Sequence, residues 1–222
     1  MVHIEHFTFN AFQERSALAW DKDGFCVFFD PGFSEASEKD KLTGFVASKG
    51  LKPVCILLTH AHMDHIYGVA ELSRAYNIPV YMHKAEKFTL DVTNSHLCRA
   101  FGLPEPEAFD WEAIDASSVI KVGSLNFEVL ETPGHSPGGV CFLERNEKIL
   151  ISGDTLFAGA IGRTDHPGGD YDLLMKNIFE KLICLDGDVA VIPGHGPDTS
   201  IADERMTNPF LLPFNEPYEE RQ

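Results

Sequence analysis

The sequence has few basic residues. Its 222 residues include 18 lysines and arginines against 34 aspartates and glutamates, which gives a net charge of -16. Such a charge disfavours a general attraction to nucleic acid phosphates or to anionic lipid. The sequence also has no apolar run long enough to cross a bilayer, and its N-terminus lacks the basic start and apolar stretch of a secretory signal. We therefore expect a cytoplasmic protein that binds neither nucleic acid nor membrane.

Cysteine is also scarce. The chain has five cysteines, and they are far apart and form no C-x-x-C pair. This pattern argues against a disulfide framework and against a cysteine zinc site, and it is typical of a reducing compartment. The five residues are Cys26, Cys55, Cys98, Cys141 and Cys184.

The composition, 44% hydrophobic and 23% charged, is that of an ordinary folded protein. Apolar alternation and turn residues predict strands over 2–9, 17–20, 25–29, 53–59, 80–82, 125–131, 140–143, 148–152 and 189–193. Helices are expected over 34–49, 68–76, 84–91 and 172–181, and the stretch 92–118 is expected to be a long loop or short helices. Strands interleaved with helices, without a linker, predict one α/β domain over 1–222, with packed sheets covered by helices.

The strongest local signal is the run His60-Ala61-His62-Met63-Asp64-His65, which places four side chains that can bind metal within six residues. In an extended segment, side chains two residues apart point the same way, so His60 and His62 can bind one ion. Asp64 and His65 follow where the chain turns into the next predicted helix, so they can point elsewhere. A chance cluster of histidines on a solvated turn is the weaker interpretation, because the run lies at the end of a predicted buried strand.

Three further metal-binding side chains follow predicted strands in the same way, each beside a glycine. They are His135 in T-P-G-H-S-P-G-G, Asp154 in S-G-D-T, and His195 in P-G-H-G-P. Glycine and proline let the backbone bend so that a side chain can point over the strand ends. Taken alone, such a residue more often belongs to a capped turn or is a surface histidine than it binds a metal. Together with the first run they make five histidines and two aspartates, the set that two ions need when one carboxylate bridges them.

The order H-x-H-x-D-H, G-H-S-x-G-G, G-D-T-L-F and G-H-G-P resembles the metallo-β-lactamase-fold superfamily, and most closely its type II glyoxalase (hydroxyacylglutathione hydrolase) branch. The resemblance implies a four-layer αββα sandwich with metals at one edge of the sheets. It also implies a ligand set: His60, His62 and His135 for the first metal, Asp64, His65 and His195 for the second, and Asp154 as the bridge. Asp30 matches an aspartate that supports the metal loop, although a plain Asp-Pro-Gly turn explains the local sequence equally well.

On this resemblance the protein is a dinuclear metal-dependent hydrolase. A hydroxide shared by two divalent cations, with Zn²⁺ the first choice and iron or manganese also permitted by the ligand types, would attack the carbonyl of a small-molecule thioester. Asp64 would orient this hydroxide in addition to binding a metal. A thiolate leaving group, whose pKa is about 8.5, needs no dedicated acid.

The loop after Asp154 departs from the glutathione-specific members of that branch. Their lysine and tyrosine correspond to Arg163 and Asp165 here, and a further tyrosine corresponds to Pro197. Few residues follow His195, so the branch's C-terminal helical domain is expected to be absent. Arg163 either binds a substrate carboxylate or pairs with Asp165. The nearby His166 is expected to be a solvated loop histidine rather than a substrate contact.

Three other functions are weaker interpretations. A mononuclear iron persulfide dioxygenase would use His60, His135 and Asp154, and its branch shares the G-R-T-D segment at 162–165, but the G-H-G-P ending at 194–197 favours the hydrolase. A β-lactamase is disfavoured because those relatives lack a bridging aspartate at this point. A non-catalytic metal-binding protein is disfavoured because the ligand set is complete and leaves open coordination positions.

Overall fold

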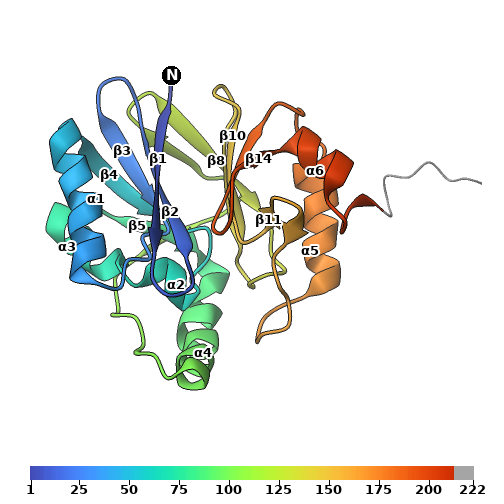
Figure 1. The fold of residues 1–222 in the computed structure, drawn as a ribbon, viewed down its shortest axis with the longest axis horizontal. Coiled ribbons are helices and arrows are strands. Elements are labelled where there is room, and N and C mark those ends of the chain that lie inside the picture. Colours follow the sequence, from blue (N-terminus) through green and yellow to red (C-terminus); the bar gives the residue numbers. More distant parts are fainter. Residues whose placement is uncertain (213–222) are drawn as a thin grey trace, which may run out of the picture.

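The computed structural model of the protein describes residues 1–212 and contains two six-stranded sheets (Figure 1). The first sheet has the order β1 (His3–Phe9), β2 (Glu14–Trp20), β3 (Phe25–Phe29), β4 (Lys52–Leu57), β5 (Val80–His83) and β6 (Glu112–Ile114). The second has the order β14 (Thr199–Ser200), β13 (Ala190–Pro193), β10 (Ile149–Gly153), β9 (Val140–Glu144), β8 (Leu125–Glu131) and β7 (Val119–Val122). Both sheets are mixed: β3 to β6 pair in parallel, as do β10 and β13, and the other neighbouring strands are antiparallel.

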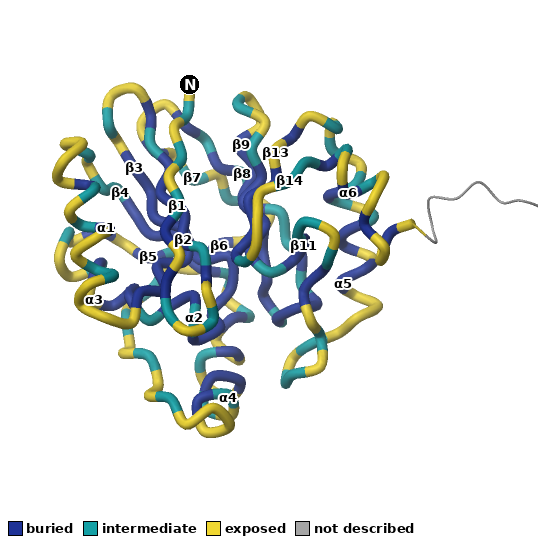
Figure 2. The backbone as a smooth tube through the Cα atoms, viewed as in Figure 1, coloured by how far each residue is buried: buried dark blue, intermediate teal, exposed yellow. Residues whose placement is uncertain are grey.

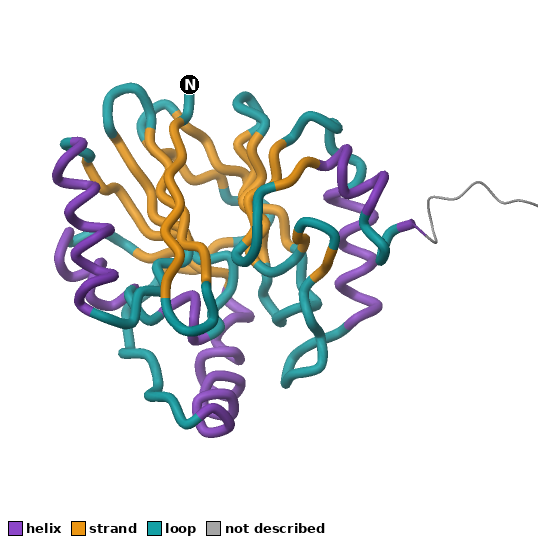
Figure 3. Tube along the Cα trace, viewed as in Figure 1, coloured by secondary structure: helices purple, strands orange, loops and turns teal. Residues whose placement is uncertain are grey.

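Helices cover the outer faces of both sheets, so the predicted αββα layering is confirmed (Figures 1 and 3). On the first sheet lie α1 (Ala36–Lys49) and α3 (Val69–Tyr76), and on the second lie α5 (Tyr171–Asn177) and α6 (Ile201–Thr207). Near one edge of the sandwich lie α2 (Met63–Ile66), α4 (Asn94–Phe101) and a small ribbon of β11 (Leu156–Phe157) and β12 (Ala160–Ile161). Within residues 1–212, no helix is long and apolar enough to cross a membrane.

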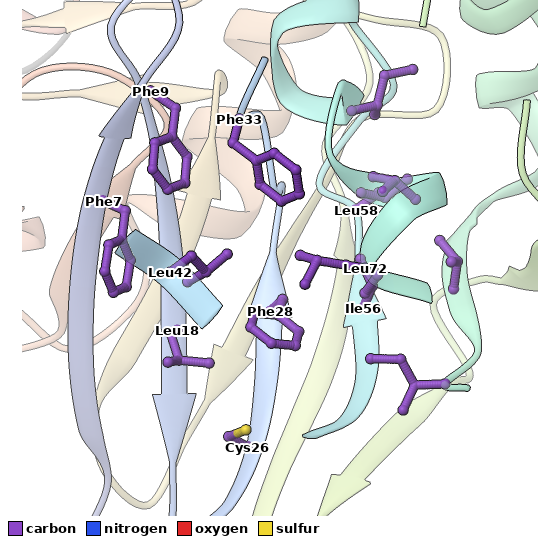
Figure 4. Close-up of a cluster of buried hydrophobic side chains, with 14 of the residues drawn as sticks. Phe7, Phe9, Leu18, Cys26, Phe28, Phe33, Leu42, Ile56, Leu58 and Leu72 are labelled. Atoms are coloured by element: carbon purple, nitrogen blue, oxygen red, sulfur yellow. The ribbon is translucent and has the colours of Figure 1, made fainter. Parts of the chain in front are cut away.

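The period-2 alternation of the central strands explains the layers. Along β3, Phe28 faces the covering helices, whereas Phe29 faces the other sheet and contacts Phe127 and Phe142 at ring distances of 5.2 and 5.6 Å. Figure 4 shows the helix-side cluster, in which Phe28 lies among aromatic and aliphatic side chains of the first sheet and of its covering helices, such as Leu42 of α1 and Leu72 of α3. The central strands are accordingly buried on both faces (Figure 2). Each fully buried side chain of this size contributes about 1.5–3 kcal/mol.

The strands and helices largely follow the sequence patterns, with several differences. The helix expected over 84–91 is a short 3₁₀ turn (Lys84–Glu86) that leads through a π-helical turn (Thr89–Thr93) into α4. The short strands β6, β7 and β14 were not expected. They lie at the sheet edges, where few residues pair and apolar alternation is weak. The ribbon of β11 and β12 and the helix α6 were not expected either.

One edge of the sandwich collects the loops that carry the predicted metal ligands. Parallel pairing puts the carboxyl ends of β3 and β4 side by side, and likewise those of β10 and β13. Asp30 and His60 follow the first pair of strands, and Asp154 and His195 follow the second pair. The loop after β8 brings His135 to the same place. The fold therefore gathers side chains that are far apart in the sequence.

Candidate metal centre

The first group of candidate ligands consists of His60, His62 and His135. One ring nitrogen from each lies within 4.8 Å of the others, and His62 Nδ1 is 2.9 Å from His135 Nε2. His62 has an extended backbone at the start of α2, so its ring points the same way as that of His60, with 4.8 Å between ring centroids. The rings of residues 60 and 62 therefore lie together on one side of the chain, and His135 joins them from the second sheet.

The second group consists of Asp64, His65 and His195, whose candidate ligand atoms also lie within 4.8 Å of one another. His195 Nε2 is 3.3 Å from His65 Nε2 and 3.4 Å from Asp64 Oδ2. Asp64 and His65 belong to the helical turn α2, whereas His62 precedes it. This change of backbone conformation separates the two groups within one six-residue run.

Asp154 lies between the two groups. Its Oδ2 is 3.5 Å from His135 Nε2 and 3.7 Å from His195 Nε2, and its Oδ1 is 3.5 Å from His65 Nε2. The close packing here requires glycine at position 194, because a Cβ there would lie 2.6 Å from both Asp154 Oδ1 and the His65 ring. The carboxylate is thus placed to bridge two ions.

The donor atoms fit divalent metal ions. His60 Nε2 and Asp154 Oδ1 are buried and have no hydrogen-bond partner in the described part of the chain, which is costly for polar atoms unless a ligand pairs with them. Burial lowers the pKa of His60 and His62 well below the usual value and that of His135 to about 4, so these imidazoles are neutral, as metal ligands must be. A mixed set of histidine nitrogens and carboxylate oxygens suits zinc, iron or manganese.

Asp30 contacts residues of both ligand groups through its carboxylate. Its Oδ1 accepts a 2.7 Å hydrogen bond from the Thr59 backbone N–H, and its Oδ2 accepts a 2.5 Å bond from the Thr59 hydroxyl and lies 3.2 Å from His65 Nδ1. The Thr59 hydroxyl is in turn 3.0 Å from His60 Nδ1. These contacts leave the Nε2 atoms of His60 and His65 free for metal binding. The structure therefore places Asp30 where the family resemblance implies, not in a plain turn.

A buried carboxylate that sequence reasoning missed joins the two loops of the first group. Glu86 is fully buried and accepts 2.7 Å hydrogen bonds from the backbone N–H groups of Ala61 and Gly138. Asn94 donates a 2.8 Å bond to the Ala61 carbonyl, so both backbone groups between His60 and His62 are held. Glu86 lies in a charged stretch that looks solvent-exposed, and no local pattern marks it.

Arg15 plays a comparable part at the second group and was also missed. Its backbone N–H donates a 2.7 Å hydrogen bond to the Gly194 carbonyl, and its guanidinium donates a 2.7 Å bond to the Gly196 carbonyl. The guanidinium also pairs with Asp198 at 2.8 Å. Arg15 therefore holds the chain on both sides of His195.

The loop after Asp154 contacts the first ligand group through the backbone carbonyl of Arg163 and the ring of His166. The Arg163 guanidinium forms a two-point ion pair with Asp165 at 2.7 and 2.9 Å, and both side chains are exposed, which matches the pairing interpretation. The Arg163 carbonyl lies 2.8 Å from His135 Nδ1 and leaves Nε2 of that ring for metal binding. The interpretation of His166 as a solvated histidine is wrong, because both of its ring nitrogens are buried and its ring packs against His135.

A family model described as the metallo-beta-lactamase superfamily matches residues 10–195. The chain belongs to the metallo-β-lactamase superfamily. It is 40% identical over 196 residues to the probable metallo-hydrolase YqgX of Bacillus subtilis, covering 87% of this chain and 90% of that protein. It is 36% identical over 213 residues to the hydroxyacylglutathione hydrolase GloC of Haemophilus influenzae, covering 95% and 98%.

Solved structures of similar fold agree with this family. The crystal structure of the BLEG-1 B3 metallo-beta-lactamase superposes with a TM-score of 0.87 at 36% identity, covering 94% of this chain and 99% of that one. The structure of TTHA1623 in a di-iron-bound form superposes with a TM-score of 0.82 at 36% identity, covering 93% and 100%. The fold, the His and Asp metal-binding groups and the general class of metal-dependent hydrolase are therefore those of this metallo-β-lactamase superfamily.

Proposed function

We propose that this protein is a two-metal hydrolase that cleaves a small-molecule thioester of the hydroxyacylglutathione type. The observation that carries the proposal is the position of the Asp154 carboxylate between two groups of three candidate ligands. The similarity to the hydroxyacylglutathione hydrolase GloC over nearly the whole chain supports the choice of a thioester.

Two divalent ions, for which zinc is our first choice and iron the alternative, would lower the pKa of a water molecule toward about 7 and polarise the thioester carbonyl. His60, His62 and His135 would hold the first ion, Asp64, His65 and His195 the second, and Asp154 both.

The chain's own residues prepare this chemistry. The hydrogen bonds to Thr59, Asp30 and the Arg163 carbonyl orient the rings of His60, His65 and His135, respectively. The Asp64 carboxylate lies beside His195, and its free lone pairs can accept a hydrogen bond from the attacking water and so orient it. The departing thiol has a pKa of about 8.5 and needs no protein acid.

We expect this protein to bind the thiol part of its thioester substrate differently from glutathione-specific enzymes. Because Arg163 is already paired with Asp165, this loop offers no unpaired cation for a glutathione carboxylate. We therefore infer a thioesterase with a broader thiol range than a strict glyoxalase II.

The deciding experiment measures metal content per chain together with turnover of S-lactoylglutathione and of a simple alkyl thioester, with and without oxygen. Two metals per chain and oxygen-independent thioester cleavage support the proposal. One iron per chain with oxygen uptake on glutathione persulfide, and no thioester cleavage, would replace it by the dioxygenase. Hydrolysis of a chromogenic cephalosporin in preference to both thioesters would make the protein a β-lactamase.

A further inference from the structure

The metal-site histidines differ in how their second ring nitrogen is paired. A histidine that binds metal through one nitrogen carries a proton on the other, and that N–H almost always donates to a neighbouring group. Three of these histidines have such a neighbour: His60 has Thr59, His65 has Asp30, and His135 has the Arg163 carbonyl. His62 faces His135 through Nδ1, and its Nε2 is buried without a hydrogen-bond partner in residues 1–212.

The ring of His166 lies against the ring of His62. The His166 and His62 centroids are 4.5 Å apart at an interplanar angle of 79°, an edge-to-face contact. Both His166 ring nitrogens are buried and, like His62 Nε2, make no hydrogen bond of normal geometry to another described residue. Two buried polar groups that each lack a partner thus touch one another.

The loop that carries His166 is held in place by three hydrogen bonds. The Thr93 hydroxyl donates to the Pro167 carbonyl at 2.9 Å, the Gly169 N–H donates to the His166 carbonyl at 2.9 Å, and the Asp170 N–H donates to the Gly134 carbonyl at 2.7 Å. These bonds hold the backbone on both sides of residue 166, so the His166 ring is kept against His62.

We propose that His166 is a positioning residue, which accepts the Nε2–H hydrogen bond of His62 when a metal binds His62 Nδ1. Metal binding at Nδ1 leaves the single proton of the neutral His62 ring on Nε2. His166 can accept it, because a neutral imidazole carries one acceptor nitrogen and both ring nitrogens of His166 are buried beside the His62 ring.

This inference rests on the metal site of the proposed function but not on the reaction, so it is tested without turnover. In ¹⁵N-histidine-labelled full-length protein loaded with Zn²⁺, we expect a slowly exchanging imidazole proton on His62 Nε2 with a coupling across the hydrogen bond to a His166 nitrogen. Absence of this coupling, or exchange of the proton as fast as in a His166→Phe variant, would overturn the proposal.

Metal affinity provides the second readout. His166→Phe keeps the ring contact but removes the acceptor, and we expect a 10- to 100-fold loss of Zn²⁺ affinity at the weakened site in chelator competition. His166→Gln supplies an acceptor oxygen and should restore part of it. His96→Phe, the same change at an exposed position of α4, is the matched control and should leave affinity unchanged. Equal affinity of the wild type and His166→Phe would refute the role. If Zn²⁺ binds but no thioester is cleaved, only the proposed function fails.

Discussion

Replacing Glu86 with glutamine tests whether one buried carboxylate holds the two loops of the first ligand group together. The two oxygens of Glu86 each accept one backbone N–H, from Ala61 and from Gly138. Glutamine has almost the same shape but only one acceptor oxygen, and its NH₂ group would face the second N–H. The substitution therefore removes one acceptor without creating a cavity.

The expected cost follows from that single lost acceptor. A buried N–H without a partner costs about 1–3 kcal/mol. Removal of a buried charge offsets part of this, since burial raises the pKa of Glu86 and so makes its ionised form costly. A net loss of about 2 kcal/mol corresponds to a fall in Tm of roughly 4–8 °C for a chain of this size. Glu86→Ala leaves both N–H groups unpaired and should cost about twice as much.

Thermal unfolding of the metal-free protein, followed by circular dichroism, measures the loss, and chelator competition measures the effect on Zn²⁺. We expect weaker binding in Glu86→Gln because the loops of His60, His62 and His135 lose a shared anchor. Glu105→Gln, the same change at an exposed loop position, is the control and should shift stability by no more than about 0.5 kcal/mol. If Glu86→Gln and Glu105→Gln have the same Tm and the same affinity for Zn²⁺, the anchoring argument is wrong.

Other perturbations have distinct expected outcomes. Asp154→Ala should abolish binding of the metal pair and turnover together, as measured by metal analysis and thioester assay; retention of two metals would contradict the bridging position. Chelation of the wild type should lower its Tm, because a ligand that binds only the folded state stabilises it. Arg15→Ala removes the guanidinium bond to the Gly196 carbonyl and should accelerate metal loss more than His6→Ala, a neighbouring change that spares this bond, and equal rates would argue against the Arg15 side chain as an anchor. The His6 and Arg15 contacts lower the pKa of Asp198 to about 2, so its stabilising effect should be present above about pH 4 and be lost as the pH falls toward 2. Asp198→Asn should therefore be less stable than the wild type at pH 6 and equal to it near pH 2, and a constant difference would refute the assignment.

The sequence patterns indicated packed sheets covered by helices and the metal-binding motifs, and the family resemblance implied the four-layer order. Alternation such as that of Phe28 and Phe29 depends only on the two-residue period of a strand, which a single segment displays. The H-x-H-x-D-H run likewise places its donors through local geometry, with an extended segment that leads into a helical turn. Features whose cause is local could be predicted before the fold was known.

The tertiary structure decided which other residues support those donors. Glu86 reaches Ala61 and Gly138, and Arg15 reaches Gly194 and Gly196, across long stretches of sequence. His166 looked like an ordinary loop histidine until the fold placed its ring on His62. Such partners pair with backbone N–H and C=O groups or with a ring N–H, which every residue of their type carries, so no sequence pattern identifies them. Burial in the folded chain alone makes those contacts necessary, because a polar group that lacks water must be paired by the protein.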